Sequence, residues 1–114
     1  MNITIELQQE DMQVKGIIKG EIDAFTAPML RERLAEIDLK ENRHVELNLT
    51  DVTYMDSTGL GVFVGFYKSV NESDVHVELT GLSSRLKRLF DITGLGDIMD
   101  IQTVSEEVKI DETV

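Results

Sequence analysis

The hydrophobic and polar positions of the chain follow two patterns, and segments with one pattern alternate along the sequence with segments of the other. In the first pattern, apolar and polar residues alternate, as expected of strands that bury one face. This alternation is found in residues 3–7, 12–22, 44–49 and 75–80. In the second pattern, apolar residues recur three and four positions apart, which predicts amphipathic helices. These predicted helices are residues 25–40, 57–70 and 83–90.

The end of the chain continues the same order of elements. Residues 92–102 predict a turn followed by a short last strand. Thr103 stands three positions before Glu106, which is the spacing of a capping box, so we expect a short helix over residues 103–110. Residues 110–114 are expected to form a frayed tail.

The order of these segments predicts an α/β fold. Residues 8–11 join the first two strands as a short hairpin, so this pair is antiparallel. Each later strand follows a helix, which implies right-handed crossovers and a mostly parallel, mixed sheet of about five strands. Because residues 44–49 and 75–80 keep a polar face, we expect the helices mainly on one face of the sheet. A chain of 114 residues fits a single domain over residues 1–114.

The charge balance argues against several classes of partner. The chain carries 22 acidic and 11 basic residues, a net charge of −11, whereas nucleic acids and anionic lipid surfaces attract basic faces. There is no cysteine, which excludes disulfides and thiolate metal sites. No apolar run could span a bilayer, and the N-terminus lacks the features of a secretion signal. We therefore expect a cytoplasmic protein that binds other proteins with basic surfaces.

Polar residues at the predicted helix starts suit a capping role. Thr26 can cap the first helix, and Ser83 can cap the third. Asp56 and Ser57 can accept hydrogen bonds from the free N–H groups at the start of the second helix. Capping alone does not explain why Ser57 is followed by glycines and by two apolar stripes.

Three glycines, Gly59, Gly61 and Gly65, lie inside the second predicted helix. Each glycine in a helix costs about 0.5–1 kcal/mol relative to alanine. A close approach of the sheet, or of a partner's backbone, would offset this cost.

Enzymatic and nucleotide-binding interpretations of the segment around Ser57 lack residues that they need. A serine hydrolase requires a base beside Ser57, but His44 and His76 fall on predicted strands away from it, and the Gly-x-Ser-x-Gly pattern is absent. A dinucleotide site would need Gly-x-Gly-x-x-Gly spacing. An aspartyl-phosphate receiver would need a lysine on the last strand to accompany Asp51 and Asp56. We therefore expect no enzymatic activity and no cofactor.

A phosphate group on Ser57 is compatible with the predicted local structure. The N–H groups and the dipole at a helix start favour an anion. A modification at this position would change the surface of the protein without unfolding it.

Three motifs in combination resemble a known family. They are Gly-Glu-Ile-Asp at residues 20–23, Thr-Ala-Pro at residues 26–28 and Asp-Ser-Thr-Gly-Leu-Gly at residues 56–61. With these motifs, the chain resembles the STAS domains of bacterial anti-sigma factor antagonists, in particular those of the general stress response. The resemblance covers the chain from Ile3 to about Val108.

The resemblance implies a partner-switching protein. An antagonist of this family binds an anti-sigma factor that is also a serine kinase, and the sigma factor is then released. The kinase phosphorylates the serine of the motif, here Ser57, with Thr58 as the second candidate hydroxyl, and the complex separates. A metal-dependent serine/threonine phosphatase restores the unmodified form. The alternative function is a STAS scaffold or sensor module of a signalling complex that releases no sigma factor.

The expected partner-binding surface surrounds the start of the second predicted helix. In the family, the loop after the second strand lies beside the phosphorylated serine. The residues expected to contribute are Asp23, Thr26, Asp56, Ser57, Thr58, Gly59 and Gly61. No catalytic residue and no metal ligand is expected.

Overall fold

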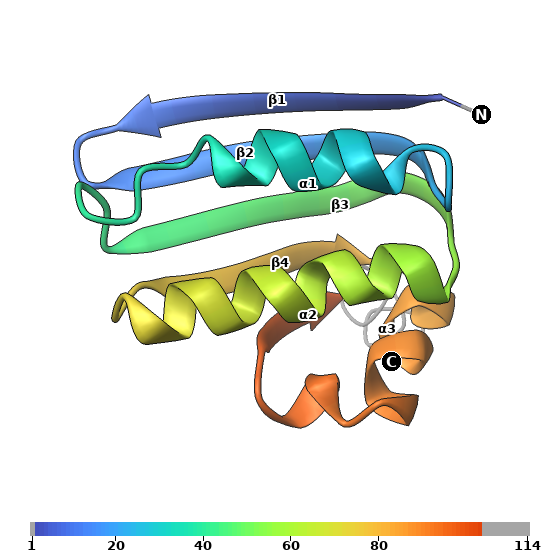
Figure 1. Cartoon of the computed structure of the whole chain (residues 1–114). Helices are drawn as coiled ribbons and strands as arrows, with labels where there is room; N and C mark the ends of the chain where they lie inside the picture. Colours follow the sequence, from blue (N-terminus) through green and yellow to red (C-terminus); the bar gives the residue numbers. More distant parts are fainter. Residues whose placement is uncertain (1, 104–114) are drawn as a thin grey trace, which may run out of the picture.

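The strands form one mixed sheet in a computed structural model that describes residues 2–103. The five strands lie in sequence order: β1 (Ile3–Glu10), β2 (Gln13–Ile22), β3 (His44–Met55), β4 (His76–Leu82) and β5 (Asp100–Thr103). Strands β1 and β2 are antiparallel, whereas β2, β3, β4 and β5 pair in parallel (Figure 1). The mixed, mostly parallel sheet predicted from the sequence is confirmed.

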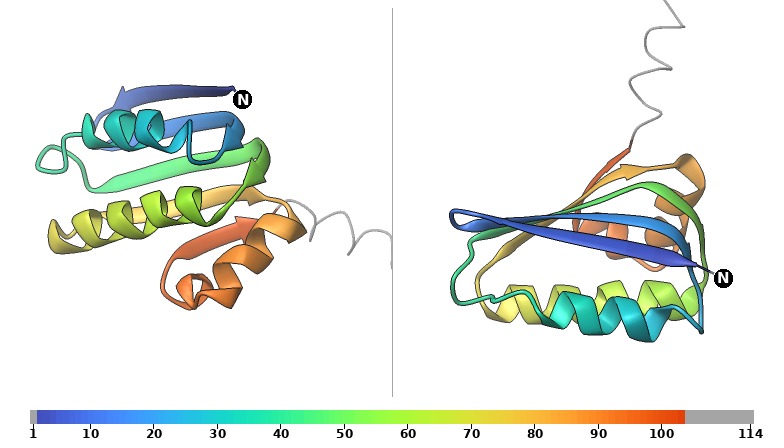
Figure 2. Two further views of the ribbon diagram at one scale, coloured as in Figure 1. Left: turned by 45° about the vertical axis from the view of Figure 1, so that its right-hand side comes forward. Right: turned by 90° about the horizontal axis from the view of Figure 1, so that it is seen from above.

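The helices lie on one face of this sheet. They are α1 (Ala27–Ala35), α2 (Ser57–Glu72) and α3 (Ser84–Ile92), with a short 3-10 helix, η1 (Leu95–Asp97), before β5. Helices α1 and α2 lie side by side below the sheet in the right-hand view of Figure 2. Helix α3 packs on the same side, because Phe90 meets Phe63 of α2 with ring centroids 6.0 Å apart. None of the helices within residues 2–103 covers the opposite face, as the polar alternation of the strands predicts.

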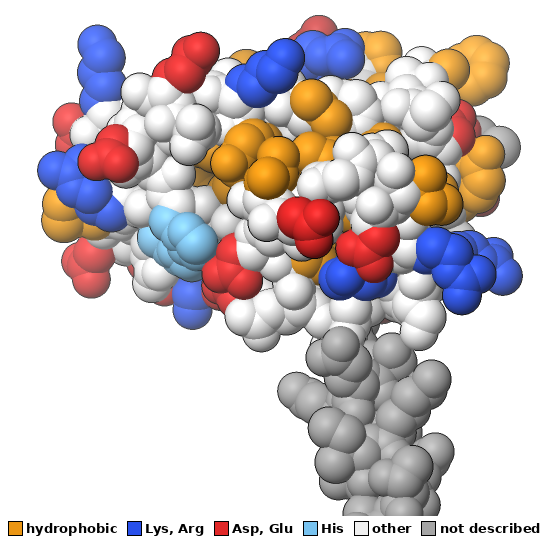
Figure 3. All heavy atoms as spheres, turned by 90° about the horizontal axis from the view of Figure 1, so that it is seen from below, with side chains coloured by type: hydrophobic (Ala, Val, Ile, Leu, Met, Phe, Trp, Pro, Cys, Tyr) orange, Lys and Arg blue, Asp and Glu red, His pale blue; other side chains and the backbone are white. Residues whose placement is uncertain are grey.

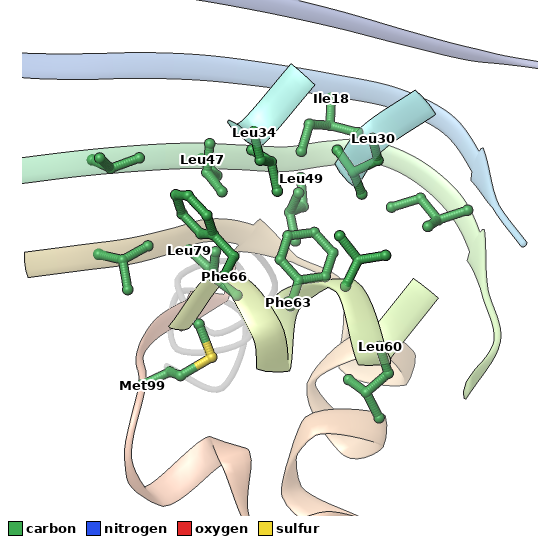
Figure 4. Packing of buried hydrophobic residues seen from close by; sticks show 14 of the residues in the cluster. Ile18, Leu30, Leu34, Leu47, Leu49, Leu60, Phe63, Phe66, Leu79 and Met99 are labelled. Carbon is green, nitrogen blue, oxygen red and sulfur yellow. The ribbon is translucent and has the colours of Figure 1, made fainter. Parts of the chain in front are cut away.

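The core lies between the sheet and these helices. Leu47 and Leu49 of β3 and Leu79 of β4 are fully buried and point toward the helices. Phe63 and Phe66 of α2 face them across the core (Figure 4). Burial of such side chains is the main favourable contribution to folding, at roughly 1.5–3 kcal/mol for each large residue. This packing holds α2 against the middle of the sheet and therefore fixes where its first residues lie.

Helix α1 is shorter than predicted. The sequence pattern predicts a helix over residues 25–40, whereas the structure has it at Ala27–Ala35. Asp38 Oδ1 accepts hydrogen bonds from the N–H groups of Lys40 and Glu41, at 2.9 and 3.3 Å. The buried side chain of Asn42 donates to the carbonyl oxygen of Asp38 at 2.8 Å. Such side-chain to backbone bonds compete with a helix, so the predicted extension to residue 40 was wrong.

Other boundaries differ by a few residues. The hairpin between β1 and β2 is tighter than predicted, with the strands meeting at Glu10 and Gln13 and Asp11 turning at a φ of 51°. Strand β3 continues beyond its predicted end at residue 49 to Met55. Thr103 is the last residue of β5, and the rest of the predicted helix and tail lies outside the described residues. No helix within residues 2–103 is long and apolar enough to cross a membrane.

Candidate functional site

The turn between β3 and α2 is organised by Asp56. This residue has an extended backbone, and its Oδ1 accepts hydrogen bonds from the N–H groups of Thr58 at 2.9 Å and Gly59 at 3.2 Å. The N–H of Asp56 donates to the carbonyl oxygen of Ile22 at 3.2 Å, which joins the turn to the end of β2. The predicted capping role of Asp56 is confirmed, and one carboxylate satisfies two of the N–H groups that a helix start leaves free.

Ser57 is the first residue of α2, and its side chain is exposed. The capping role also predicted for Ser57 was wrong, because Asp56 supplies the cap and the Ser57 hydroxyl makes no hydrogen bond with the described part of the chain. Helix α2 has 16 residues, so Ser57 stands at the positive end of a long helix dipole. Thr58 is also exposed, but its backbone N–H is bound to Asp56. Ser57 and Thr58 therefore both present exposed hydroxyls in this turn, and Ser57 is the one at the first position of the helix.

Gly59 allows the start of α2 to lie against the end of β2. An added Cβ would lie 2.5 Å from Ile22 Cγ2 and 3.0 Å from Met55 Cγ. Real Cβ atoms do not approach side chains this closely, so a larger residue would push the helix start outward. The predicted close approach is confirmed at Gly59 as a contact within the protein. At Gly61 and Gly65 an added Cβ would meet nothing within 4 Å, so internal packing does not explain these two glycines.

The loop after β2 is held by Asp23. Its Oδ1 accepts hydrogen bonds from the N–H groups of Phe25 at 2.9 Å and Thr26 at 3.0 Å, and the side chain is buried. Burial opposes ionisation of Asp23, but the hydrogen bonds from the N–H groups of Thr26 and Phe25 outweigh it. The pKa of Asp23 is therefore lowered from its usual value of 3.8.

Thr26 occupies the N-cap position of α1 without capping the helix through its side chain. Its hydroxyl donates to the carbonyl oxygen of Glu21 at 2.7 Å and accepts from the N–H of Asp23 at 2.9 Å. The prediction that Thr26 caps the helix was wrong, because the hydroxyl instead closes the loop onto the end of β2. Ser83, by contrast, caps α3 as predicted, accepting from the N–H of Leu86 at 3.2 Å.

The two turns lie beside each other and enclose a shallow pocket of about 320 Å³. It is lined by Glu21, Asp23, Ala24, Phe25, Tyr54 and Asp56. Phe25 is 83% exposed and Tyr54 is 49% exposed. Aromatic side chains are enriched at protein interfaces, where they supply large contact areas. We call these six residues, together with Ser57 and Thr58, the Ser57 surface.

The structure brings together most of the residues predicted to form the binding surface. Asp23, Asp56, Ser57 and Thr58 belong to the Ser57 surface. Thr26 and Gly59 are buried and support this surface from below. Gly61 is exposed one turn further along α2, where it lines a separate groove between α1 and α2.

The two exposed aromatic residues of the Ser57 surface, Phe25 and Tyr54, were not predicted from the sequence. Tyr54 follows the point in β3 where regular burial alternation stops after Leu49. Phe25 is a large apolar residue within a three-residue turn between Asp23 and α1. An apolar residue that interrupts a strand or turn pattern was the available signal. The sequence alone does not show that Phe25 and Tyr54 line the same pocket.

The histidines of the chain lie far from the Ser57 surface. His44 begins β3, whereas Ser57 follows the last residue of that strand. From His44 to Met55 the strand makes 11 steps of about 3.3 Å, so its two ends lie about 35 Å apart. The charged groups of the Ser57 surface are the carboxylates of Glu21, Asp23 and Asp56, which make it negative.

Comparison with known proteins places the chain in a family. The STAS domain family model matches residues 5–110. The chain therefore belongs to the STAS domain family.

Its sequence relatives include proteins named anti-sigma-B factor antagonist. The relative from Listeria monocytogenes is 49% identical over 110 residues, covering 96% of both chains. The relative from Bacillus subtilis is 48% identical over 106 residues, covering 93% of this chain and 96% of that protein. Among solved structures, an anti-sigma factor antagonist from Mycobacterium paratuberculosis has the same fold, with a TM-score of 0.80 at 20% identity. That match covers 93% of this chain and 90% of the other.

Proposed function

We propose that this chain is a cytoplasmic anti-sigma factor antagonist and not an enzyme. In its unphosphorylated form it binds an anti-sigma factor that is also a serine kinase, and the bound anti-sigma factor releases its sigma factor. Phosphorylation of Ser57 by that kinase separates the complex, and a metal-dependent serine/threonine phosphatase restores the unmodified form. Similarity over nearly the full length to proteins named anti-sigma-B factor antagonist supports this role.

The observation that carries the proposal is the exposed Ser57 hydroxyl at the start of α2. A kinase substrate must present a hydroxyl that the fold does not need, and Asp56 performs the capping that a serine would otherwise provide. The product must also be compatible with the folded state. A phosphate at the amino end of a helix meets the positive end of the dipole, so the fold can hold it.

Charge explains why the modification would end binding. A phosphate adds about −1.5 to −2 charges at neutral pH to a surface that already holds Glu21, Asp23 and Asp56. In the free protein this charge stays hydrated, whereas a packed interface would desolvate it at a cost of several kcal/mol. A loss of about 2.8 kcal/mol weakens a complex about a hundredfold. The switch therefore changes the binding surface and leaves the fold in place.

The same surface indicates the chemistry of the partner. Its carboxylates and the net charge of −11 favour a basic contact area on the kinase. Phe25 and Tyr54 would be buried at the centre of such a contact, where aromatic residues contribute most to affinity. Nucleic acid and membranes are not proposed as partners.

The test is phosphosite mapping with the cognate anti-sigma kinase and Mg-ATP. Wild type, Ser57→Ala and Thr58→Ala are incubated in parallel, and mass spectrometry locates the phosphate. Binding of each unmodified chain to the kinase is measured by calorimetry. We expect one phosphate on Ser57 in wild type and Thr58→Ala, no phosphate in Ser57→Ala, and binding by all three.

The other outcomes contradict parts of the proposal. A phosphate on Thr58 that persists in Ser57→Ala would move the switch to the second hydroxyl. A stable complex without phosphate would favour the scaffold or sensor function. If the kinase neither phosphorylated the chain nor bound it, the proposed function would be wrong.

A further inference from the structure

Two histidines and three carboxylates gather on the open face of the sheet, at the end remote from Ser57. Parallel pairing places His44 beside His76 and Glu46 beside Glu78 on strands β3 and β4. Asp100 of β5 lies in register with Glu78. Figure 3 shows histidine side chains in pale blue next to acidic side chains in red on this part of the molecule.

Three of these side chains are spaced as metal ligands. The candidate ligand atoms of His44, Glu46 and Glu78 all lie within 4.8 Å of one another. His44 Nε2 is 3.5 Å from Glu78 Oε1. The side chains of His44 and Glu78 are only 30% and 18% exposed, so both are partly removed from water. The ligands come from two neighbouring strands of the sheet, which hold their backbones rigidly.

The charges of this cluster are poorly balanced by the residues around it. Glu46 and Glu78 stand directly opposite each other, an arrangement of like charges that destabilises a sheet. Lys15 of β2 is in register with Glu46, but its Nζ pairs with Glu10 at 3.8 Å. Within the described residues, His44 is the potential cation in ion-pair contact with Glu78. A bound cation would remove the repulsion between the two glutamates.

Neighbouring side chains orient two of the three candidate ligands, His44 and Glu78. The ring of His44 stacks on that of His76, with centroids 5.1 Å apart and an interplanar angle of 22°. Gln102 Nε2 donates to Glu78 Oε2 at 2.5 Å, which leaves Oε1 toward His44. His76 Nε2 is itself paired with Asp100 Oδ2 at 2.9 Å. Such outer contacts fix the ligands of metal sites.

We propose that His44 Nε2, Glu46 and Glu78 bind a divalent cation of the zinc class. Imidazole and carboxylate ligands suit zinc, whereas magnesium and calcium prefer oxygen ligands alone. Tetrahedral zinc keeps its ligand atoms about 3.3 Å apart, and His44 Nε2 and Glu78 Oε1 are already 3.5 Å apart. The fourth position is open to water. This site goes beyond the proposed switch and does not depend on it.

The test is a calorimetric titration of the full chain, without an affinity tag, with zinc chloride in a buffer that does not chelate zinc. The absence of cysteine removes thiolates as competing ligands. His44→Gln and Glu46→Gln test the site. Glu6→Gln is the control for Glu46→Gln. Glu6 is an exposed glutamate of β1, which is separated from β3 by strand β2. His76→Gln tests which histidine binds, and thermal unfolding confirms that each variant folds.

We expect one zinc ion per chain, a loss of affinity of at least about tenfold for His44→Gln and Glu46→Gln, and unchanged binding for Glu6→Gln. His76→Gln should weaken binding less than His44→Gln does, and millimolar magnesium should not compete. Absence of saturable zinc binding by the wild type would overturn the proposal. So would equal binding by wild type and His44→Gln, or a loss in His76→Gln as large as that in His44→Gln.

Discussion

The two ends of β3 both carry carboxylates, but the carboxylates have different partners. At the Met55 end, Asp23 and Asp56 accept hydrogen bonds from backbone N–H groups, which makes them parts of two turns. At the His44 end, Glu46 and Glu78 face each other across regular strands. Carboxylates that bind backbone groups leave neighbouring side chains free for a partner, whereas carboxylates that face one another favour a cation.

The largest effect on stability is expected at the junction beneath the Ser57 surface. Gly59→Ala places a Cβ 2.5 Å from Ile22 Cγ2 and should lower the free energy of unfolding by about 1–3 kcal/mol. Gly61→Ala is the matched control, because its Cβ meets nothing within 4 Å and should raise the free energy of unfolding by about 0.5–1 kcal/mol. Urea unfolding measures both values. Equal changes in the two variants would contradict the close approach at Gly59.

Truncation of the exposed aromatic residue at the Ser57 surface tests its role in binding. Phe25→Ala should weaken the complex with the anti-sigma kinase by about 1–2 kcal/mol, roughly five- to thirtyfold, while stability changes little because Phe25 is exposed. Ile98→Ala removes another exposed apolar side chain, beyond η1, and serves as the control. Calorimetry gives both affinities. A similar loss in the two variants would show that the contact is not centred on the Ser57 surface.

The division of roles between Asp56 and Ser57 predicts unequal effects on stability. Asp56→Ala removes the cap of α2 and should cost about 1 kcal/mol of folding stability. Ser57→Ala should stay within about 0.5 kcal/mol of wild type, because the hydroxyl makes no structural contact with the described residues. Thermal unfolding compares the two variants. A larger loss for Ser57→Ala would mean that the serine is needed by the fold.

The lowered pKa of Asp23 predicts a dependence on pH at the Met55 end. A carboxyl group with a lowered pKa in the folded state stabilises the protein above its unfolded pKa, here near 3.8. This contribution is lost as the pH falls through the lower pKa of the folded state. Wild type should therefore have a higher free energy of unfolding than Asp23→Ala at pH 7. This difference between the two proteins should become smaller below pH 3.8. A difference in free energy of unfolding that grows on acidification would contradict the lowered pKa of Asp23.

The smallest effect is expected for a substitution at the His44 end of β3 on kinase binding at the Ser57 surface. His44→Gln should leave the affinity for the anti-sigma kinase within about twofold of wild type, since the two ends are about 35 Å apart. A clear loss of kinase binding in this variant would show that the two ends act together.

Periodicity was enough to predict the sheet and the side of it that the helices cover. The alternation around Leu47 and Leu79 encodes one buried and one polar face, and the order of segments fixes the parallel pairing. The end of α1 was predicted wrongly because Ile37 continues the apolar stripe and is buried although it lies beyond the helix. Local bonds from Asp38 and Asn42 decide that boundary, and periodicity does not report them.

The candidate site was predictable where it is local in sequence. Asp56 is adjacent to a predicted helix start, so its capping role followed from position, whereas the capping predicted for Ser57 did not occur. Phe25 and Tyr54 become neighbours only through the parallel pairing of β2 and β3, and the proposed ligands His44 and Glu78 only through the pairing of β3 and β4. Such contacts depend on strand register, which one sequence does not specify.

The proposed switch is tested by comparing the affinity of the anti-sigma kinase for two forms of this chain. One is unmodified and the other carries a phosphate on Ser57, and both are checked by mass spectrometry and by circular dichroism. We expect phosphorylation to weaken the complex by about a hundredfold or more and to leave the circular dichroism spectrum of the folded protein unchanged. Equal affinity of the two forms would contradict the proposed switch.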